Sequence, residues 1–508
     1  MRAVVRAREA MQGQRRPAPA EQAGEPRTNK WVMLAIVAVG VFMATLDTSI
    51  VNISLPSIAR YFGVALTGAI EWVIIAYLVV IASVLLTFGR LSDQIGRKPL
   101  WMAGLAIFTV GSALCGMAPS LLLLIAARGL QGLGAAMLFA VSPAMLTGAF
   151  PPSERGRALG LNAVVVALGT SAGPTLGGLI TDQLSWRWIF FVNVPLGIAG
   201  ILATWRLLHE RVEHKQVRFD PFGALLLGSG LAAVTLGLSF GQEWGWTSPL
   251  LIGVIAFGIV ALVLMVVVER RVQDPIVDLA LLRNRVFASA NASLVLSFLA
   301  LFAVSFLLPF YFEQLRGFSP LKSGLLLTPL PLSIAVVAPF SGSLADRIGT
   351  RWLAAGGLTL ACLGLVLISM LSATSAVWDI VWRLVVTGIG QAMFQSPNNS
   401  ALMGSAPKEE QGEAAGFLAT GRVIGQSCSV ALAGAVFAGA GATAAGQALA
   451  AAIHGHALPH GRLTALQHTF TSGFHAAFLV CAGVAAIGVV TSLVRGDEQT
   501  AGALQKHV

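Results

Sequence analysis

Two ionisable side chains stand inside long apolar stretches of this chain, where a charge is costly. Asp47 lies in the apolar run 31–54, and Arg128 lies in the apolar run 121–147. Ionisable groups in such runs are rare and mark sites that bind protons, ions or substrates. A guanidinium near a carboxylate favours the charged carboxylate, so proton binding at such a pair depends on their separation. We therefore expect Asp47 and Arg128 to form a proton-coupling pair.

The positions of these two residues within their runs place them at a similar depth. At about 1.5 Å per residue, Asp47 lies about 24 Å from the start of its run and Arg128 about 10 Å from the start of its own. If the two runs are antiparallel helices, the side chains can meet. The alternative is that Asp47 only makes a helix-packing hydrogen bond, with Thr48 or Asn52 beside it.

A short charged turn, GRLSDQIGRKPL, joins two apolar runs from Gly89 onward. Gly89 and Gly96 permit a tight turn and a close approach of helices. Asp93 can accept hydrogen bonds from a helix N-terminus or pair with Arg97. Such a cluster can act as a latch that holds one arrangement of the helices, or it can simply anchor the turn on one side of a membrane.

The same pattern returns as GSLADRIGTR, which begins 253 residues later (342 − 89 = 253). In this copy Thr350 stands in the place of Arg97. We expect the second latch to be formed by Gly342, Asp346, Gly349 and Arg351. Two copies in matching places favour the latch over the simple anchor.

A stripe of small residues marks a third candidate motif. Gly169, Gly173 and Gly177 recur every four residues, with Gly178 beside them, so another helix can approach this face closely. Pro174 removes a backbone hydrogen bond and bends the helix. The stripe is either a pliant seam that controls which face opens or a site of ordinary tight packing.

Other chemistries find little support in the sequence. It contains neither a G-x-x-x-x-G-K-[ST] nucleotide loop nor an H-E-x-x-H metal helix. G-x-S-x-G occurs from Gly169 and from Gly237, but in apolar helical runs and without a neighbouring base. His454, His456, His460 and His468 fit no metal-ligand spacing, and we expect them in a solvated loop. We therefore expect no enzyme activity, no metal and no cofactor.

The elements that position these residues are membrane helices. The chain is 56% hydrophobic and only 11% charged, against about a quarter charged in a soluble domain. Apolar runs of about 20 residues recur along its length, as membrane-spanning helices require. We predict about fourteen spans, at 31–54, 69–90, 99–117, 121–147, 158–181, 187–206, 222–241, 248–268, 288–312, 323–345, 352–371, 377–402, 414–440 and 472–494.

The distribution of basic residues predicts the orientation. Most lysines and arginines fall in the tails and in the gaps on their side, and few fall in the opposite gaps. By the positive-inside rule both termini are cytoplasmic, in a cytoplasmic (inner) membrane. Orientation accounts for the net charge of +10, so we expect no nucleic-acid partner. About 30 polar, basic residues precede the first apolar run, and that run is too long for the apolar region of a signal peptide, so we expect residues 1–30 to be a disordered tail.

Internal repeats divide the chain into two halves. RGLQGLGAA from Arg128 pairs with RLVVTGIGQA from Arg383 (383 − 128 = 255), and stretches from Gly156 and Gly412 also match. Parallel repeats of this kind characterise secondary transporters with a central substrate site. The predicted domains are a tail at 1–30, six-helix bundles at 31–206 and 288–495, linkers with two extra helices at 207–287, and a tail at 496–508.

The motifs together resemble one family. GRLSDQIGRK resembles the loop signature of the major facilitator superfamily. LDTSIVNISLPSIA, RGLQGLGAA, GTSAGPTLGG and WRWIFFVNVPLG resemble motifs of its fourteen-span drug/proton antiporters, the EmrB/QacA-like group. The resemblance implies an all-α major facilitator fold with two six-helix bundles and two extra linking helices. It also implies export of drugs or other small molecules in exchange for protons, driven by the proton gradient without a cofactor.

The cargo is expected to bind near the midplane between the two halves. We expect a hydrophobic or cationic drug-like cargo, membrane lipid as surroundings and a monomer. The candidate cavity residues are Asn52, Tyr77, Gln131, Phe306, Phe394 and Arg422. Arg422 and Arg383 either bind a substrate anion or brace a helix, and bracing is favoured. A non-transporting sensor or an uncoupled facilitator on the same fold is the alternative function.

Overall fold

The computed structural model describes residues 29–64, 68–151, 154–208, 221–269, 281–406, 411–453 and 459–495. These residues form helices joined by short turns, and no strand occurs among them. The first half contains α2 (Lys30–Phe62), η1 (Gly68–Glu71), α3 (Trp72–Ile95), α4 (Arg97–Met117), α5 (Leu121–Ala149), α6 (Arg155–Gln183), α7 (Trp188–Phe191) and α8 (Asn193–Leu207).

The remaining helices follow in chain order. Two of them, α9 (Pro221–Trp244) and α10 (Pro249–Glu269), come between the halves. The second half contains η3 (Leu281–Arg283), α11 (Arg285–Phe310), the π-helical turn η4 (Tyr311–Leu315), α12 (Pro320–Leu327), α13 (Pro329–Ile348), α14 (Thr350–Ser369), α15 (Val377–Gly404), α16 (Gln411–Gly439), α17 (Ala442–Ile453) and α18 (His460–Leu493).

Twelve of the helices in the described part are long and apolar enough to cross a membrane. Helices occupy the other two predicted ranges as well, as α9 and α15, but these are not among the twelve. The prediction of an all-helical membrane protein is confirmed, whereas the count of fourteen spans stays a prediction. The N- and C-terminal tails, and most of the predicted linkers on either side of α9 and α10, lie outside the described residues.

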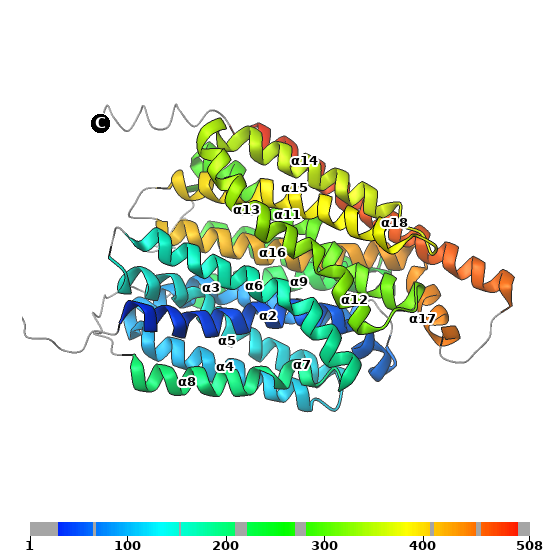
Figure 1. Cartoon of the computed structure of the whole chain (residues 1–508), viewed down its shortest axis with the longest axis horizontal. Coiled ribbons are helices and arrows are strands. Elements are labelled where there is room, and N and C mark those ends of the chain that lie inside the picture. The colour runs from blue at the N-terminus through cyan, green and yellow to red at the C-terminus, as the bar shows by residue number, and fades with distance from the viewer. Residues whose placement is uncertain are drawn as a thin grey trace, which may run out of the picture.

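The long helices lie side by side along one direction (Figure 1). Helices α2 to α8 pack together as one bundle, and α11 to α18 pack together as the other. We name the two ends of the molecule after α2: the Lys30 end and the Phe62 end. Asn29 caps the start of α2, where its Oδ1 accepts a hydrogen bond from the Trp31 amide at 2.9 Å. Gly63, at φ 65°, ends the helix.

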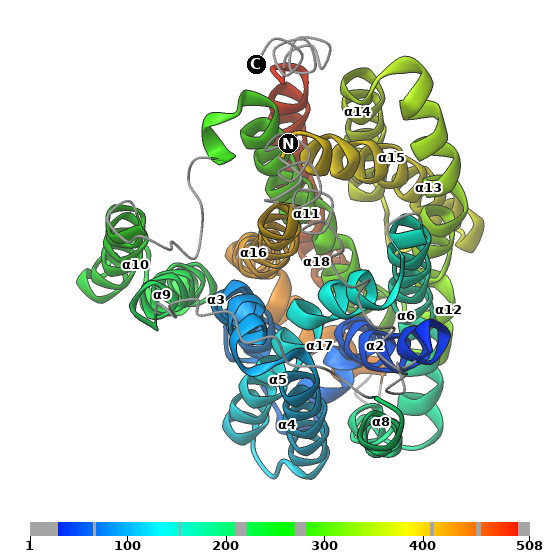
Figure 2. The same ribbon diagram turned by 90° about the vertical axis from the view of Figure 1, so that its left-hand side faces the viewer.

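The two extra helices lie to one side of the bundles. In the view along the helices, α9 stands beside α3 and α16, with α10 farther out (Figure 2). Helix α9 contacts both α3 and α16, one from each bundle, whereas α10 packs mainly on α9. The side chains of α10 are largely exposed in the isolated chain, including Val260 and Val263. An apolar helix with this exposure is suited to contact lipid.

The two bundles repeat the same local geometry. Gly96 between α3 and α4 has φ 95° and ψ 153°, and Gly349 between α13 and α14 has φ 88° and ψ 152°. A Cβ on Gly134 of α5 would lie 2.4 Å from the amide nitrogen of Phe108, and one on Gly390 of α15 would lie 2.3 Å from that of Ala361. The repeat seen in the sequence is therefore a repeat of helix packing.

Several predicted spans differ from the helices. The span at 187–206 is two helices, α7 and α8, and the span at 323–345 is two helices, α12 and α13. Helix α18 begins at His460, so the expectation of a loop at His460 and His468 is wrong. Its polar first turns hid it from a search for apolar runs. His454 and His456 lie outside the described residues.

Candidate functional site

Asp47 and Arg128 meet inside the first bundle. Asp47 lies on α2 and Arg128 on α5, and the Arg128 Nη1 donates to the Asp47 Oδ2 at 2.5 Å. Their side chains are 0% and 1% exposed. The two helices run in opposite directions, so residues at different distances from their helix starts reach the same depth. The predicted pair is therefore formed in the structure, while its role in proton coupling remains a proposal.

Two amides complete the surroundings of the carboxylate. Gln131 donates from Nε2 to Asp47 Oδ1 at 2.8 Å, and Asn193 of α8 donates from Nδ2 to the same oxygen at 3.1 Å. Both amides also lie within hydrogen-bond distance of the Ser112 Oγ on α4, which in turn donates to the carbonyl of Phe190 at 2.8 Å. Four helices thus position one buried carboxylate.

Arg128 has acceptors besides Asp47. Its Nε donates to the carbonyl of Val73 on α3 at 2.8 Å, and its Nη1 also reaches the Gln131 Oε1 at 2.7 Å. The guanidinium lies 4.2 Å from the ring centroid of Tyr77, whose hydroxyl donates to the carbonyl of Ala44. These contacts can hold the cation when Asp47 is neutral.

The packing role for Asp47 stays an alternative, but neither Thr48 nor Asn52 is its hydrogen-bond partner among the described residues. The hydroxyl of Thr48 donates to the carbonyl of Ala44 at 3.0 Å, and the Asn52 Oδ1 has no hydrogen-bond partner among the described residues. Asp47 instead bonds across helices. Sequence reasoning missed Asn193 and Ser112 as partners. Asn193 lies in the quoted stretch WRWIFFVNVPLG, where an amide in an apolar run was an available signal.

The glycine stripe of α6 packs against α2 beside this network. A Cβ on Gly169 would meet the Thr45 Oγ1 at 2.2 Å, and a Cβ on Gly173 would meet the Ser49 Oγ at 1.8 Å. Gly177 follows the same face against α2, with Ile50 and Ile53 closest. The stripe therefore lets α6 lie tightly against the helix that carries Asp47, as the sequence predicted.

The neighbouring residues of α6 face the other bundle. A Cβ on Gly178 would lie 2.3 Å from the carbonyl oxygen of Pro320 in α12. In turn, a Cβ on Gly324 of α12 would lie 2.0 Å from the carbonyl oxygen of Pro174. Helix α6 is thus packed tightly on both sides, within its own bundle and across the interface.

The first charged turn is anchored within its own bundle. Arg97 donates to the carbonyl of Ala144 on α5 at 2.6 Å, and Lys98 donates to that of Leu208 after α8 at 2.5 Å. Gly89 is helical in α3, and Asp93 lies in the last turns of the same helix. The side chains of Asp93 and Asp346 lie outside the described residues.

The second charged turn takes a guanidinium from a distant helix end. Arg495, just after α18, is buried and donates to the Thr350 Oγ1 at 3.4 Å and to the Asn398 Oδ1. Thr350 is the residue that replaces the arginine of the first copy. Arg351 lies over the ring of Trp352 at 5.3 Å, and Gly342 packs near the Ser396 Oγ.

The candidate cavity residues fall into different surroundings. Phe306 and Phe394 are fully buried in the apolar core, where Phe306 contacts Phe310 edge to face. Arg383 pairs with Asp379 at 2.9 Å and donates to the carbonyl of Leu367 at 2.7 Å, so it braces a helix.

Arg422 differs from the other arginines of the spans. It is only partly buried on α16, 5.8 Å from the ring centroid of Phe298, and it makes no hydrogen bond or ion pair within the described ranges. The ionisable neighbour that acts on its charge is Tyr77 of the opposite bundle. A guanidinium without an acid partner at the bundle interface is available to a ligand.

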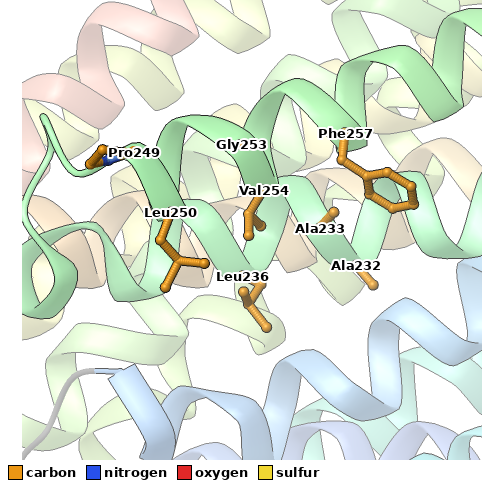
Figure 3. Close-up of a pocket in the computed structure, with 8 residues that line it drawn as sticks. All are labelled: Ala232, Ala233, Leu236, Pro249, Leu250, Gly253, Val254 and Phe257. Carbon is orange, nitrogen blue, oxygen red and sulfur yellow. The ribbon is translucent and has the colours of Figure 1, made fainter.

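A surface groove of about 480 Å³ lies on the extra helices and not near this site. Figure 3 shows its lining, with Leu236 on α9 and Leu250, Val254 and Phe257 on α10. The lining is apolar and the groove opens outward, so it belongs to the lipid-exposed face of the molecule.

The sequence matches the Major Facilitator Superfamily over residues 37–227 and 222–430. It is 37% identical over 392 residues to the riboflavin transporter RibZ of Clostridioides difficile, covering 77% of this chain and 84% of RibZ. It is 35% identical over 413 residues to the multidrug resistance protein Stp of Mycobacterium tuberculosis, covering 81% and 76% of the two chains.

Solved structures share the fold. The bacterial homologue of the human lysosomal transporter Spinster, in an inward-facing and unoccupied conformation, superposes with a TM-score of 0.65 at 16% identity. The superposition covers 93% of this chain and all of that chain. RibZ is named as a riboflavin transporter and Stp as a multidrug resistance protein. The chain belongs to the Major Facilitator Superfamily and is a multi-pass membrane protein built on its fold.

Proposed function

We propose that this protein is a secondary active transporter that exports drugs or other small molecules in exchange for protons by alternating access. The observation that carries the proposal is the buried Asp47–Arg128 pair. The relatives named as a riboflavin transporter and a multidrug resistance protein support a small-molecule cargo. We further propose fourteen membrane spans, a monomer in the cytoplasmic membrane, and a Lys30 end that faces the cytoplasm.

The geometry suggests how a proton and a movement are coupled. Two amide donors occupy Oδ1 of Asp47, and Arg128 occupies Oδ2. An added proton neutralises the carboxylate and weakens its attraction to the Arg128 cation, so Arg128 can move away. Arg128 is the donor with other partners in reach, on Val73 and Tyr77. Protonation would therefore shift Arg128 toward α3.

Helix α3 passes this movement to the second bundle. It carries Val73 and Tyr77, and it contacts α16 across the interface. Arg422 of α16 acts electrostatically on Tyr77 from the other side. In this proposal a cargo group that accepts hydrogen bonds binds the guanidinium of Arg422, and Tyr77 of α3 contacts the guanidinium of Arg128 in the proton site. The charged turns at the Lys30 end would latch one arrangement of the bundles.

Transport in reconstituted vesicles tests this proposal. Purified protein is placed in vesicles with an acidic lumen, and riboflavin and ethidium are offered outside as probes. We expect uphill accumulation of at least one probe, together with a rise of luminal pH as protons leave. Asp47→Asn, which removes the titratable group, should abolish both signals.

The matched control is Asp379→Asn, which removes an acid of the ion pair with Arg383 in the other bundle. This variant should keep proton exchange. Probe movement that ignores the pH gradient would instead indicate an uncoupled facilitator, and no movement of any probe would favour a sensor. Uphill export by a well-folded Asp47→Asn variant would overturn the proposed role of Asp47.

A further inference from the structure

A second buried carboxylate lies where the two bundles meet near the Phe62 end. Glu313 belongs to the π-helical turn η4 after α11, and its side chain is only 2% exposed. Its Oε2 lies 3.7 Å from an Nη of Arg60 on α2, in the other bundle. π-helical turns inside helices are rare and are often found at functional sites.

Little in the protein supports the negative charge of Glu313. Neither of its carboxyl oxygens has a hydrogen-bond partner among the described residues. Within the described ranges the charged groups that face it are Arg60 on α2 and Asp182 on α6, with the hydroxyl of Ser57 also nearby. Asp182 repels a second negative charge, so among the charged groups of the described residues only Arg60 favours the ionised form, with a smaller contribution from the Ser57 hydroxyl.

Arg60 supports this charge only while the bundles are together. Its side chain is 47% exposed, so it can reach solvent without Glu313. Glu313 is fixed in its own bundle, because Tyr311 donates to the carbonyl of Ser372 and Arg316 donates to that of Ser375. A separation of the bundles would therefore leave Glu313 without its cation.

A second polar contact crosses the interface between the bundles. The hydroxyls of Thr175 on α6 and Thr328, at the junction of α12 and α13, lie 2.6 Å apart across it. Thus the Arg60–Glu313 pair joins an interface that is closed in this structure. A buried carboxylate that loses its only cation is stabilised by taking up a proton.

We propose that Glu313 is a second proton-binding residue, and that its ion pair with Arg60 holds the Phe62 end closed until Glu313 is protonated. A proton from the Phe62 side would weaken the pair and favour opening. The use of this proton in a transport cycle rests on the proposed exchange of protons for cargo. The closure itself can be measured without transport.

Disulfide cross-linking at defined pH tests the proposal. In a background without Cys115, Cys362, Cys428 and Cys481, the double variant Thr175→Cys/Thr328→Cys reports whether the bundles are together. The matched control is Ser54→Cys/Thr181→Cys, because these hydroxyls lie 2.7 Å apart within one bundle on α2 and α6. The measured quantity is the cross-linking rate of the Thr175/Thr328 cysteine pair divided by that of the Ser54/Thr181 cysteine pair. This ratio removes the ordinary pH dependence of thiol reactivity.

We expect this ratio to fall about fivefold from alkaline to acidic pH, as expected for loss of an ion pair with one exposed partner. Glu313→Gln should give the low ratio at every pH. Arg60→Gln should also lower the ratio at alkaline pH. This substitution leaves little void, because the Arg60 side chain is half exposed. Arg187→Gln, an arginine that contacts Tyr61 and Ala118 within its own bundle, should behave like the parent protein.

A ratio that does not change with pH in the parent protein would overturn the proposal. So would a Glu313→Gln or Arg60→Gln variant with the parent ratio at all pH values. If the ratio responds as expected but no probe is exchanged for protons in vesicles, the gate stands and the proposed transport cycle fails. The two proposals can therefore fail separately.

Discussion

Asp47 receives three N–H donors from two helices other than its own, and all three favour its negative charge. In a low-dielectric interior such charge-assisted hydrogen bonds are strong, and each contributes about 1.5–3 kcal/mol. The charged state is thus well supported, and protonation would weaken the attraction between Asp47 and its donors. A site of this kind responds to a proton by moving its donors.

The Asn193 amide provides a residue-scale prediction. Asn193→Ala removes one donor from Asp47 Oδ1 and should make the carboxylate easier to protonate. We expect proton exchange in vesicles to shift toward higher pH and its rate at neutral pH to change about tenfold. Asn399→Ala, which removes an amide whose Oδ1 has no hydrogen-bond partner in the described part of the chain, is the control. Identical pH profiles for Asn193→Ala and the parent would contradict this role.

The meeting of Asp47 and Arg128 was predictable, because both are charges in apolar runs and helix rise sets their depth. The contributions of Ser112 and Asn193 were not predictable, because the rotation of α4 and α8 about their axes depends on packing between helices. The aromatic candidates Phe306 and Phe394 show the same limit. Whether these two rings line a cavity or pack in the core depends on which helices surround them, and the sequence alone does not show this.

At the scale of elements, the glycines of α6 decide how closely it approaches α2. Any side chain on Gly173 would overlap the Ser49 Oγ, and the α2 backbone lies just behind it. Space for such a side chain requires the two helices to separate. The close packing of α6 against α2, the helix that carries Asp47, therefore requires glycine at these positions of α6.

Gly173→Ala should destabilise the protein by about 1–3 kcal/mol, as overpacking of a close contact does. Thermal unfolding in detergent measures the effect. Gly160→Ala is the control, because a Cβ there meets no atom within 4 Å and alanine favours a helix more than glycine does. If Gly173→Ala unfolds at the parent temperature or above it, the close packing of α6 on α2 is not a source of stability.

The two charged turns have the same backbone geometry, which the repeat predicts, but different sources of their guanidinium, which it does not predict. The geometry of Gly96 and Gly349 is nearly the same, as the repeated sequence led us to expect. In the second turn Thr350 stands in the place of the first turn's arginine. Instead, Arg495 supplies a guanidinium from a position 145 residues away, which a local motif cannot show.

At the scale of the whole molecule, two similar bundles meet along a long interface, and α9 lies against both (Figure 2). The Asp47 site lies inside one bundle, whereas Glu313 and Arg422 lie at or near the interface. In the proposed cycle, proton binding in the first bundle and opening at the interface are separate events. Helix α2 carries both Asp47 and Arg60, and α3 contacts both the first bundle and α16.

The charge distribution makes a prediction about orientation. If the Lys30 end is cytoplasmic, a cysteine at the Phe62 end reacts with a membrane-impermeant maleimide in intact cells. Leu184→Cys, 64% exposed after α6, should be labelled. Ile348→Cys, 53% exposed at the other end, should react only after permeabilisation. The reverse pattern would show that the molecule is inserted the other way.

Proton release on cargo binding tests most directly the claim that Asp47 exchanges a proton for cargo. The purified protein is titrated with riboflavin or ethidium in weakly buffered solution, and the pH is followed with an indicator. We predict that binding to the parent protein releases protons and that binding to Asp47→Asn releases fewer, by up to one per bound molecule. Equal release by the two proteins, with equal binding, would contradict the role of Asp47.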